Sequence, residues 1–256
     1  MTHLEEQTMQ PAVSSKLSVE EVAFFNDHGY VLPPRQVFGP DRFADLKAVF
    51  DEHLADKGDS LSDELDTPHF RDPRLLSFLL ADEVLDLVEP VIGPDIALWS
   101  SHFLSKDPHT GKPTPWHEDS AYWQGRLSAY APIVTVWLAL TRSGPENGCV
   151  RVIPGTHRNG FSEYEDTGRE RFFSTQIKGE VDDSSAVNFE LDPGQCSLHD
   201  GRIIHGAGAN TSPIRRTGYT MRYFSAAIRV IPEANPGHRI WLARGRDLAG
   251  NTYEAS

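Results

Sequence analysis

The sequence predicts a mainly β domain, either a sandwich or a jelly roll, with helices packed on the outside. From about residue 96 onward, the chain consists of short segments rich in β-branched and aromatic residues, separated by Gly, Pro, Asn and Asp. About ninety residues with mostly helical periodicity precede this region. The chain has 256 residues, of which 39% are hydrophobic, so it can bury one large core.

Three helical segments are expected before the strands begin. The first follows residues 18–21, whose S-x-x-E pattern is typical of a capping box. The second has apolar residues at helical spacing after Asp41, which we expect to act as its N-cap. The third covers residues 74–93 with a break in its middle. Residues 1–17 are polar and expected to be disordered, which leaves 18–256 as a single domain.

The strand-like segments share a high content of Val, Ile, Trp, Tyr and Phe and are bounded by turn residues. They cover residues 96–106, 133–140, 149–154, 195–200, 202–206 and 218–228. Between the third and fourth of them, residues 160–188 are charged and lack a regular pattern. This segment is therefore expected to be a long loop that covers part of the domain.

Composition excludes several classes of function. The formal net charge of −13 disfavours a nucleic-acid or anionic-membrane surface, because neutralising phosphates requires an excess of Lys and Arg. No apolar run approaches the roughly 20 residues that cross a bilayer. The N-terminus lacks the basic start and apolar run of a signal peptide, so we expect a cytoplasmic protein. Cys149 and Cys196 fit no disulfide or metal framework and are expected to be buried.

The stretch PWHEDSAYW contains an H-x-D pattern at His117 and Asp119. In an extended backbone, residues two apart point to the same side, so both side chains can converge on one point while Glu118 points away. An isolated H-x-D is more often an ordinary polar strand end. Its meaning depends on whether other parts of the chain supply further ligands.

Two later residues can complete such a site. His205 is expected to end an apolar strand before a glycine that lets another group approach the backbone. His199 competes for the same role, but the turn expected at residues 200–201 should place it elsewhere. Arg216 is expected near the start of a strand beside the one that carries His205, where a guanidinium can bind a carboxylate. Taken alone, Arg216 would be read as a surface residue.

Two imidazoles and one carboxylate with open coordination positions are typical of non-haem Fe(II) sites that react with oxygen. A structural zinc site would more commonly have four protein ligands, often cysteines, which this chain lacks. The sequence also contains no G-x-S-x-G, no phosphate-binding GxxxxGK[ST] and no H-E-x-x-H. These observations favour an open metal site over the alternatives.

The order of these motifs resembles the phytanoyl-CoA dioxygenase family of Fe(II)/2-oxoglutarate-dependent oxygenases. The resemblance rests on the H-x-D, the distant His-Gly, and an Arg eleven residues after that His, and on the stretches WLALTRSGPENGCVRVIPGTHRNG and LHDGRIIHGAGANTSPIRRTGYTMRYF. It covers about residues 18–230. It implies a double-stranded β-helix core, which is a jelly roll of the cupin-like type, over about 96–230, with a helical part up to about residue 93.

The resemblance also implies roles for individual residues. The iron ligands would be His117, Asp119 and His205, and Arg216 would bind the distal carboxylate of 2-oxoglutarate. Trp137 and His102 would line the cosubstrate pocket. Thr135 would supply a hydrogen bond that Ala207 cannot make, because many family members have Ser at that position. The substrate would contact residues just after the H-x-D, namely Tyr122, Trp123 and Arg126.

The implied activity is oxidation of an aliphatic C–H of a small molecule with Fe(II), 2-oxoglutarate and O₂. Hydroxylation in secondary-metabolite tailoring is favoured; ring closure, desaturation and epimerisation use the same chemistry. Asp119 argues against a halogenase, since halogenating relatives have Ala or Gly at this position. One alternative is catabolic hydroxylation of an amino acid, phosphonate or acyl derivative. Alternatives of other classes are a non-catalytic jelly-roll binding protein and a cupin-like metal isomerase.

Overall fold

The computed structural model describes residues 16–56, 65–166 and 175–255. The α-helices are α1 (Val19–His28), α2 (Pro40–Asp56), α3 (Leu76–Leu79) and α4 (Asp82–Ile92). The strands are β1 (Tyr30–Val31), β2 (Ile96–Lys106), β3 (Thr114–His117), β4 (Ile133–Ala139), β5 (Val150–Val152), β6 (Tyr164–Asp166), β7 (Thr175–Ile177), β8 (Val187–Asn188), β9 (Cys196–Asp200), β10 (His205–Ala207), β11 (Arg216–Ser225) and β12 (Trp241–Arg244). The 3₁₀ helices are η2 (Pro68–Phe70), η3 (Pro73–Leu75), η4 (Asp119–Trp123), η5 (Pro145–Asn147), η6 (Thr156–Arg158) and η7 (Pro232–Ala234).

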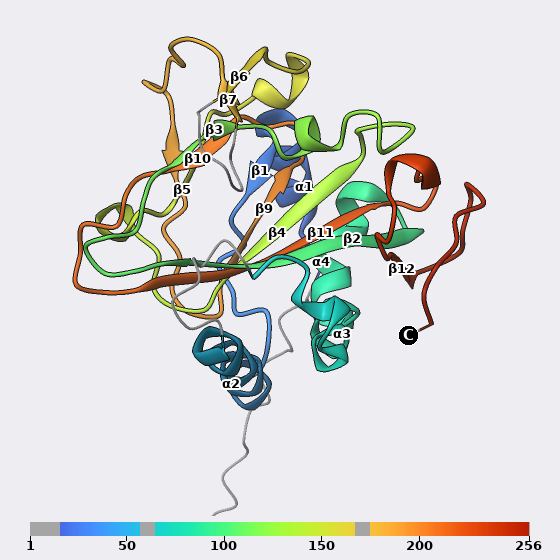
Figure 1. The fold of residues 1–256 in the computed structure, drawn as a ribbon, viewed down its shortest axis with the longest axis horizontal. Helices are drawn as coiled ribbons and strands as arrows, with labels where there is room; N and C mark the ends of the chain where they lie inside the picture. The colour runs from blue at the N-terminus through green and yellow to red at the C-terminus, as the bar shows by residue number, and fades with distance from the viewer. Residues whose placement is uncertain (1–15, 57–64, 167–174, 256) are drawn as a thin grey trace, which may run out of the picture.

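Two antiparallel sheets form the core of the molecule. The large sheet has the strand order β1-β9-β4-β11-β2-β12, and the small sheet has the order β3-β10-β5-β8. Figure 1 shows α2, α3 and α4 on one side of the large sheet and β3, β10 and β5 on the other. From β2 to β5 and again from β8 to β11, sequential strands alternate between the two sheets, as in a double-stranded β-helix. The predicted fold class, a jelly-roll core with flanking helices, is confirmed.

The alternation of side chains along the central strands explains this layering. On β11, Tyr219, Met221 and Tyr223 are fully buried in the cluster that includes the helices. The residues between them, Thr220 and Arg222, line a cavity on the opposite face. Because side chains of a strand alternate between its two faces, one face of β11 packs on α4 while the other faces the small sheet.

The helical segments largely follow their predicted boundaries. Ser18 accepts a hydrogen bond from the backbone of Glu21, whose side chain reaches back to Ser18, so the capping box is present. The second helix begins at Pro40 rather than after Asp41, because proline is favoured at the first helical position. Asp41 therefore lies in the first turn, and its predicted role as N-cap is wrong. No described helix is long and apolar enough to cross a membrane.

The N-terminal tail was predicted to include residues 1–17, of which 1–15 lie outside the described residues. Leu17 is only 7% exposed and belongs to the core cluster that includes residues of α1 and α4. The packed domain therefore begins before residue 18, where the prediction placed its start. The segment 160–188 also differs from the prediction of a loop, because it contains the hairpin β6–β7 and strand β8. Both cysteines are buried and unpaired, as expected.

A buried histidine beside β12 predicts how stability changes with pH. His69 is 2% exposed, and burial, with His238 and Arg239 nearby, lowers its pKa to about 3. The unfolded chain has the ordinary His pKa near 6.5, so below that pH it binds more protons than the folded chain. The free energy of unfolding therefore decreases as the pH is lowered below about 6.5. His69 alone should make metal-free protein about 2 kcal/mol less stable at pH 5 than at pH 7. Urea unfolding at both pH values measures this loss, which His69→Gln should reduce; an equal loss in the variant would contradict it.

Candidate active site

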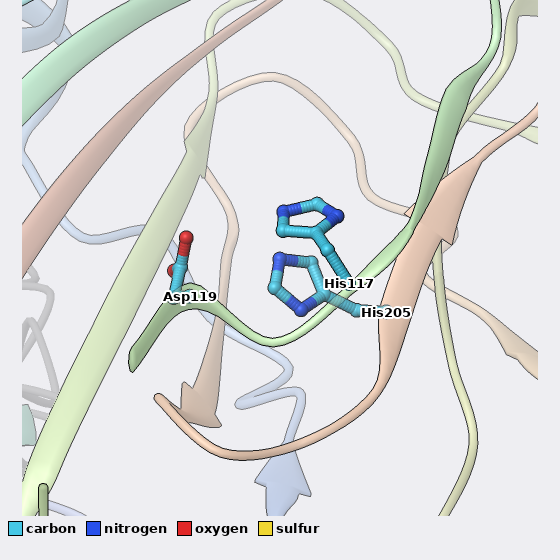
Figure 2. A group of neighbouring side chains, drawn as sticks. All are labelled: His117, Asp119 and His205. Carbon is cyan, nitrogen blue, oxygen red and sulfur yellow. The ribbon is translucent and has the colours of Figure 1, made fainter. Parts of the chain in front are cut away.

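Three buried side chains meet between the two sheets. His117 is the last residue of β3, Asp119 is the first of η4, and His205 is the first of β10. His205 pairs in register with His117, and their ring centroids lie 4.1 Å apart. One potential ligand atom from each residue lies within 4.8 Å of the other two. Figure 2 shows the two imidazoles side by side, with the Asp119 carboxylate opposite them. The structure thus brings together the three residues that the sequence singled out.

Each imidazole is oriented by the backbone through its Nδ1 atom. Nδ1 of His117 lies 2.8 Å from the carbonyl oxygen of Pro115, and Nδ1 of His205 lies 3.1 Å from that of Ile203. A carbonyl only accepts, so Nδ1 carries the proton and Nε2 carries the lone pair that a metal ion needs. Burial lowers the pKa of His117 and lowers the pKa of His205 well below its usual range. Both rings are therefore neutral at pH 7 and suited to ligation.

The strand that carries His205 starts later than predicted. Oδ1 of Asp200 accepts a hydrogen bond of 2.8 Å from the backbone N–H of Arg202, and the Asp200 carbonyl accepts one of 3.1 Å from Ile203. These bonds form a turn, so His205 begins β10 instead of ending a strand over 202–206. That prediction is wrong, although the position of His205 in the site does not depend on it.

The same turn brings His199 to the site. His199 is 2% exposed, its Nε2 lies 3.7 Å from Oδ2 of Asp119, and its ring centroid lies 4.7 Å from that of His205. Among the described residues, neither of its ring nitrogens has a hydrogen-bond partner. The prediction that it lies elsewhere is wrong, because β9 and β10 belong to different sheets that face each other across the cavity.

Arg216 enters the same cavity at the start of β11. It is 2% exposed, and its Nε and Nη1 atoms have no hydrogen-bond partner in the described part of the chain. Burial lowers its pKa to about 10, so it remains a cation at pH 7. A buried cation without a carboxylate is costly unless an anion joins it. The expected strand neighbour is wrong: β11 pairs with β2 and β4, so Arg216 faces His205 from the opposite sheet.

Trp137 supports this arginine and offers a further donor. The Arg216 guanidinium lies 5.2 Å from the centroid of its indole ring, a cation–π distance. Trp137 is 1% exposed, and its Nε1 also lacks a partner among the described residues. Both residues line the cavity that holds the three clustered ligands. The cavity thus contains unpaired N–H donors from Arg216 and Trp137, in addition to the three clustered ligands.

Gly218 makes room for this indole. A Cβ atom at Gly218 would overlap the six-membered ring of Trp137. We expect Gly218→Ala to displace Trp137, to destabilise the protein by about 1–3 kcal/mol, and to weaken anion binding beside Arg216. Urea unfolding and calorimetric titration with 2-oxoglutarate measure the two effects. Gly39→Ala is the control, since an added Cβ there has nothing within 4 Å; equal behaviour of the two variants would refute this role.

The carboxylate of Asp119 is held by two side chains from the large sheet. Thr135 donates to Oδ2 at 2.7 Å, while Arg222 donates through Nε to Oδ2 at 3.2 Å and through Nη2 to Oδ1 at 3.0 Å. Burial would raise the pKa of Asp119, but Arg222, His199 and His205 hold it well below its usual range. Asp119 is therefore ionised. The single hydroxyl proton of Thr135 is committed to Asp119 and is not available to a cosubstrate.

The remaining predicted residues lie at varying distances from the cavity. His102 is fully buried on β2, with Nδ1 3.9 Å from a carboxylate oxygen of Asp66, and is not in the cavity wall. Trp123 packs with Leu127 and Phe224 in a separate core cluster. Arg126 donates to Asn235 at 2.7 Å and lies over the ring of Trp99. Tyr122 is 37% exposed, with its ring 5.7 Å from that of His117.

Glu118 points away from the ligands, as predicted, and ties them to the β6–β7 hairpin. It is fully buried and accepts hydrogen bonds from the backbone N–H of Ser162 at 3.0 Å, from the Ser162 hydroxyl at 2.7 Å, and from the Tyr164 hydroxyl. The Tyr164 oxygen in turn accepts from the backbone N–H of Glu118 at 2.8 Å. This network fixes the backbone between His117 and Asp119.

The residues of this cavity fit a metal ion and a dicarboxylate. Two neutral imidazoles and one carboxylate converge within 4.8 Å, a ligand set that leaves coordination positions open on a six-coordinate ion. The buried Arg216 provides the charge that a carboxylate needs at the far end. The donor set therefore suits iron with a chelating 2-oxo acid better than a closed structural site.

Comparisons with known proteins agree with this description. The family model of phytanoyl-CoA dioxygenase (PhyH) matches residues 25–218. Peroxisomal phytanoyl-CoA dioxygenase from Homo sapiens is 28% identical over 162 residues, which make up 60% of this chain and 47% of the human protein. The non-heme monooxygenase ThoJ has a TM-score of 0.75 at 22% identity, over 91% of this chain and 87% of ThoJ. EvdO2 from Micromonospora carbonacea var. aurantiaca, complexed with 2-oxoglutarate, has a TM-score of 0.67 at 25% identity, over 88% of this chain and 97% of EvdO2.

These matches differ in how much they cover. The chain spans about half the length of the curated relatives it matches, 47% of the human protein and 43% of the one from Bos taurus. The family model, however, covers residues 25–218, which is well over half of the chain. The chain belongs to the phytanoyl-CoA dioxygenase (PhyH) family.

Proposed function

We propose that this protein is an Fe(II)- and 2-oxoglutarate-dependent dioxygenase that oxidises an aliphatic C–H of a small molecule. The observation that carries the proposal is the pairing of two features in one cavity. Three ligands for an open metal site lie at one end, and a buried arginine without a carboxylate partner among the described residues lies at the other. A simple metal isomerase would not need this arginine, and a binding protein would not need the ligands.

The roles of the residues follow from their surroundings. His117, Asp119 and His205 would hold the iron, and Arg216 would bind the distal carboxylate of 2-oxoglutarate while Trp137 orients the guanidinium. When bound, the iron would supply the oxidising chemistry, in which one oxygen atom of O₂ goes into succinate as 2-oxoglutarate loses CO₂ and the other oxidises the C–H of the substrate. The protein excludes water from the cavity and fixes the orientation of the reactants.

The presence of Asp119 supports oxygenation rather than halogenation. A carboxylate occupies the coordination position that a halide would need, and Arg222 and Thr135 hold it in place. Hydroxylation is the simplest outcome, and ring closure, desaturation or epimerisation would use the same site.

We further propose that the substrate is a small organic molecule, as in secondary-metabolite tailoring. The ring of Tyr122 lies 5.7 Å from that of His117 and 6.2 Å from that of Tyr164, so one aromatic ring lies beside a ligand and a second lies beside the first. An aromatic ring beside a metal ligand supports an organic substrate that packs against it. The net charge of −13 does not favour a coenzyme A ester, whose phosphates would require basic residues.

Conversion of 2-oxoglutarate to succinate tests the proposal. Protein with Fe(II) in air should produce succinate, and oxygen removal or replacement of iron by zinc should stop it. Candidate substrates are then ranked by how much they increase the rate, and their products identified by mass spectrometry. Unchanged 2-oxoglutarate in a sample shown by calorimetry to bind both iron and 2-oxoglutarate would contradict an oxygenase.

A further inference from the structure

The strand β11 carries two buried arginines on the same face, six residues apart, and their surroundings are opposite. Arg216 has unpaired donors in the described part of the chain. Arg222, which is 8% exposed, directs its guanidinium at one carboxylate, that of Asp119, and contacts each of its oxygens. Its remaining nitrogen, Nη1, lies 3.4 Å from the Thr220 hydroxyl. Arg222 is therefore already satisfied and is not a second site for an anion.

The two oxygens of Asp119 are unequally occupied. Oδ2 accepts from Thr135 at 2.7 Å and from Nε of Arg222 at 3.2 Å, so both of its lone pairs are used. Oδ1 accepts one hydrogen bond, from Nη2 of Arg222 at 3.0 Å. One lone pair on Oδ1 is therefore left for a metal ion, whereas Oδ2 has none to offer.

We infer that Arg222, together with Thr135, is a positioning residue that makes Asp119 bind the metal ion through Oδ1 alone. A planar guanidinium that holds both oxygens prevents the carboxylate from rotating about its Cβ–Cγ bond. A freely rotating carboxylate could instead chelate the ion with both oxygens. With two imidazoles, single-oxygen binding leaves three positions of a six-coordinate ion open, and chelation would leave two.

The functional consequence of this inference rests on the proposed function. An iron ion held there would need open positions for both 2-oxoglutarate and O₂. Arg222 would thus keep a coordination position open through its hydrogen bonds to the two oxygens of Asp119. Affinity for the metal is a poor criterion, because loss of Arg222 removes a repulsive positive charge and also loosens a ligand.

The visible absorption of Co(II) in the otherwise metal-free protein tests the inference, because the energies and intensities of its d–d bands change when a second carboxylate oxygen replaces a water ligand. The metal is added alone, without 2-oxoglutarate. We expect bands of shifted energy and changed intensity in Arg222→Gln, in which the amide cannot hold both oxygens. Arg222→Lys should show an intermediate spectrum, since it keeps the charge without the fork, and Thr135→Val a smaller change in the same direction. Arg244→Gln is the matched control, because Arg244 bridges Asp82, Asp86 and Glu89 away from the site.

The outcomes separate this inference from the proposed function. A wild-type Co(II) spectrum in folded Arg222→Gln overturns the inference and leaves the oxygenase proposal intact. Should Arg222→Gln fail to fold, unchanged spectra in Arg222→Lys and Thr135→Val overturn it equally. A changed spectrum in a protein that does not bind 2-oxoglutarate supports the inference and contradicts the oxygenase. A wild-type protein that binds no Co(II) overturns both.

Discussion

Replacing Arg216 by Gln is expected to weaken 2-oxoglutarate binding at least about 30-fold, which corresponds to the roughly 2 kcal/mol or more lost when one partner of a buried charge pair is truncated. The guanidinium is buried against Trp137 and has no carboxylate partner among the described residues, so a bound dicarboxylate would be its main counter-charge. Gln keeps some hydrogen-bonding capacity but no charge. Calorimetric titration of Mn(II)-loaded protein with 2-oxoglutarate measures the change without turnover.

The neighbouring Arg215 offers a matched control for this experiment. Its side chain is 38% exposed and paired with Asp107. Arg215→Gln should bind 2-oxoglutarate like the wild type, and metal affinity should be the same in both variants. Equal 2-oxoglutarate affinity in Arg216→Gln and Arg215→Gln would show that the buried cation is not the carboxylate site.

Replacing His205 by Ala is expected to abolish tight metal binding. Removing a group that only hydrogen-bonds to a metal ligand lowers metal affinity by up to roughly 100-fold. Because His205→Ala removes a ligand itself, its metal affinity should fall by more than that. Among the described residues the ligand cluster contains only His117 and Asp119 besides His205, so two ligands would remain in the variant. Calorimetric titration of metal-free protein with Mn(II) or Co(II) measures the affinity.

His69→Gln serves as the control for that measurement, because His69 is also buried but lies beside Trp241, outside the cavity. It should bind metal with wild-type affinity. If His205→Ala retained that affinity, His199 would be the first residue to test as a replacement ligand, since its ring lies 4.7 Å from that of His205.

The site residues that the sequence predicts correctly are those whose spacing or composition within a short segment carries the information. The two-residue spacing of His117 and Asp119 in an extended segment is enough to put their side chains on one side, and Glu118 on the other. Arg216 was recognised by its distance in sequence from His205. The strands β2, β4 and β11 were predicted within three residues because their β-branched and aromatic content is high along their length.

The residues that were missed or misplaced depend on contacts between distant strands. In the sequence, nothing distinguishes Arg222 from the other residues of its strand. Only the pairing of β11 with β4 places it beside Thr135. Its distance of six residues from Arg216, an even number, was the available signal, since it places both arginines on one face. For His199, the turn at residues 200–201 suggests from the sequence that it lies apart from His205, whereas this turn crosses from one sheet to the other and brings both to the cavity.

The assignment of this cavity to iron and 2-oxoglutarate is tested most directly by anaerobic addition of Fe(II) and then 2-oxoglutarate to metal-free protein, followed by visible spectroscopy. We expect a charge-transfer band of the iron–2-oxoglutarate chelate in the wild type. We expect this band to be lost in His117→Ala and to require far more 2-oxoglutarate in Arg216→Gln. A wild-type protein that binds iron but shows no band would contradict the assignment of this cavity to 2-oxoglutarate.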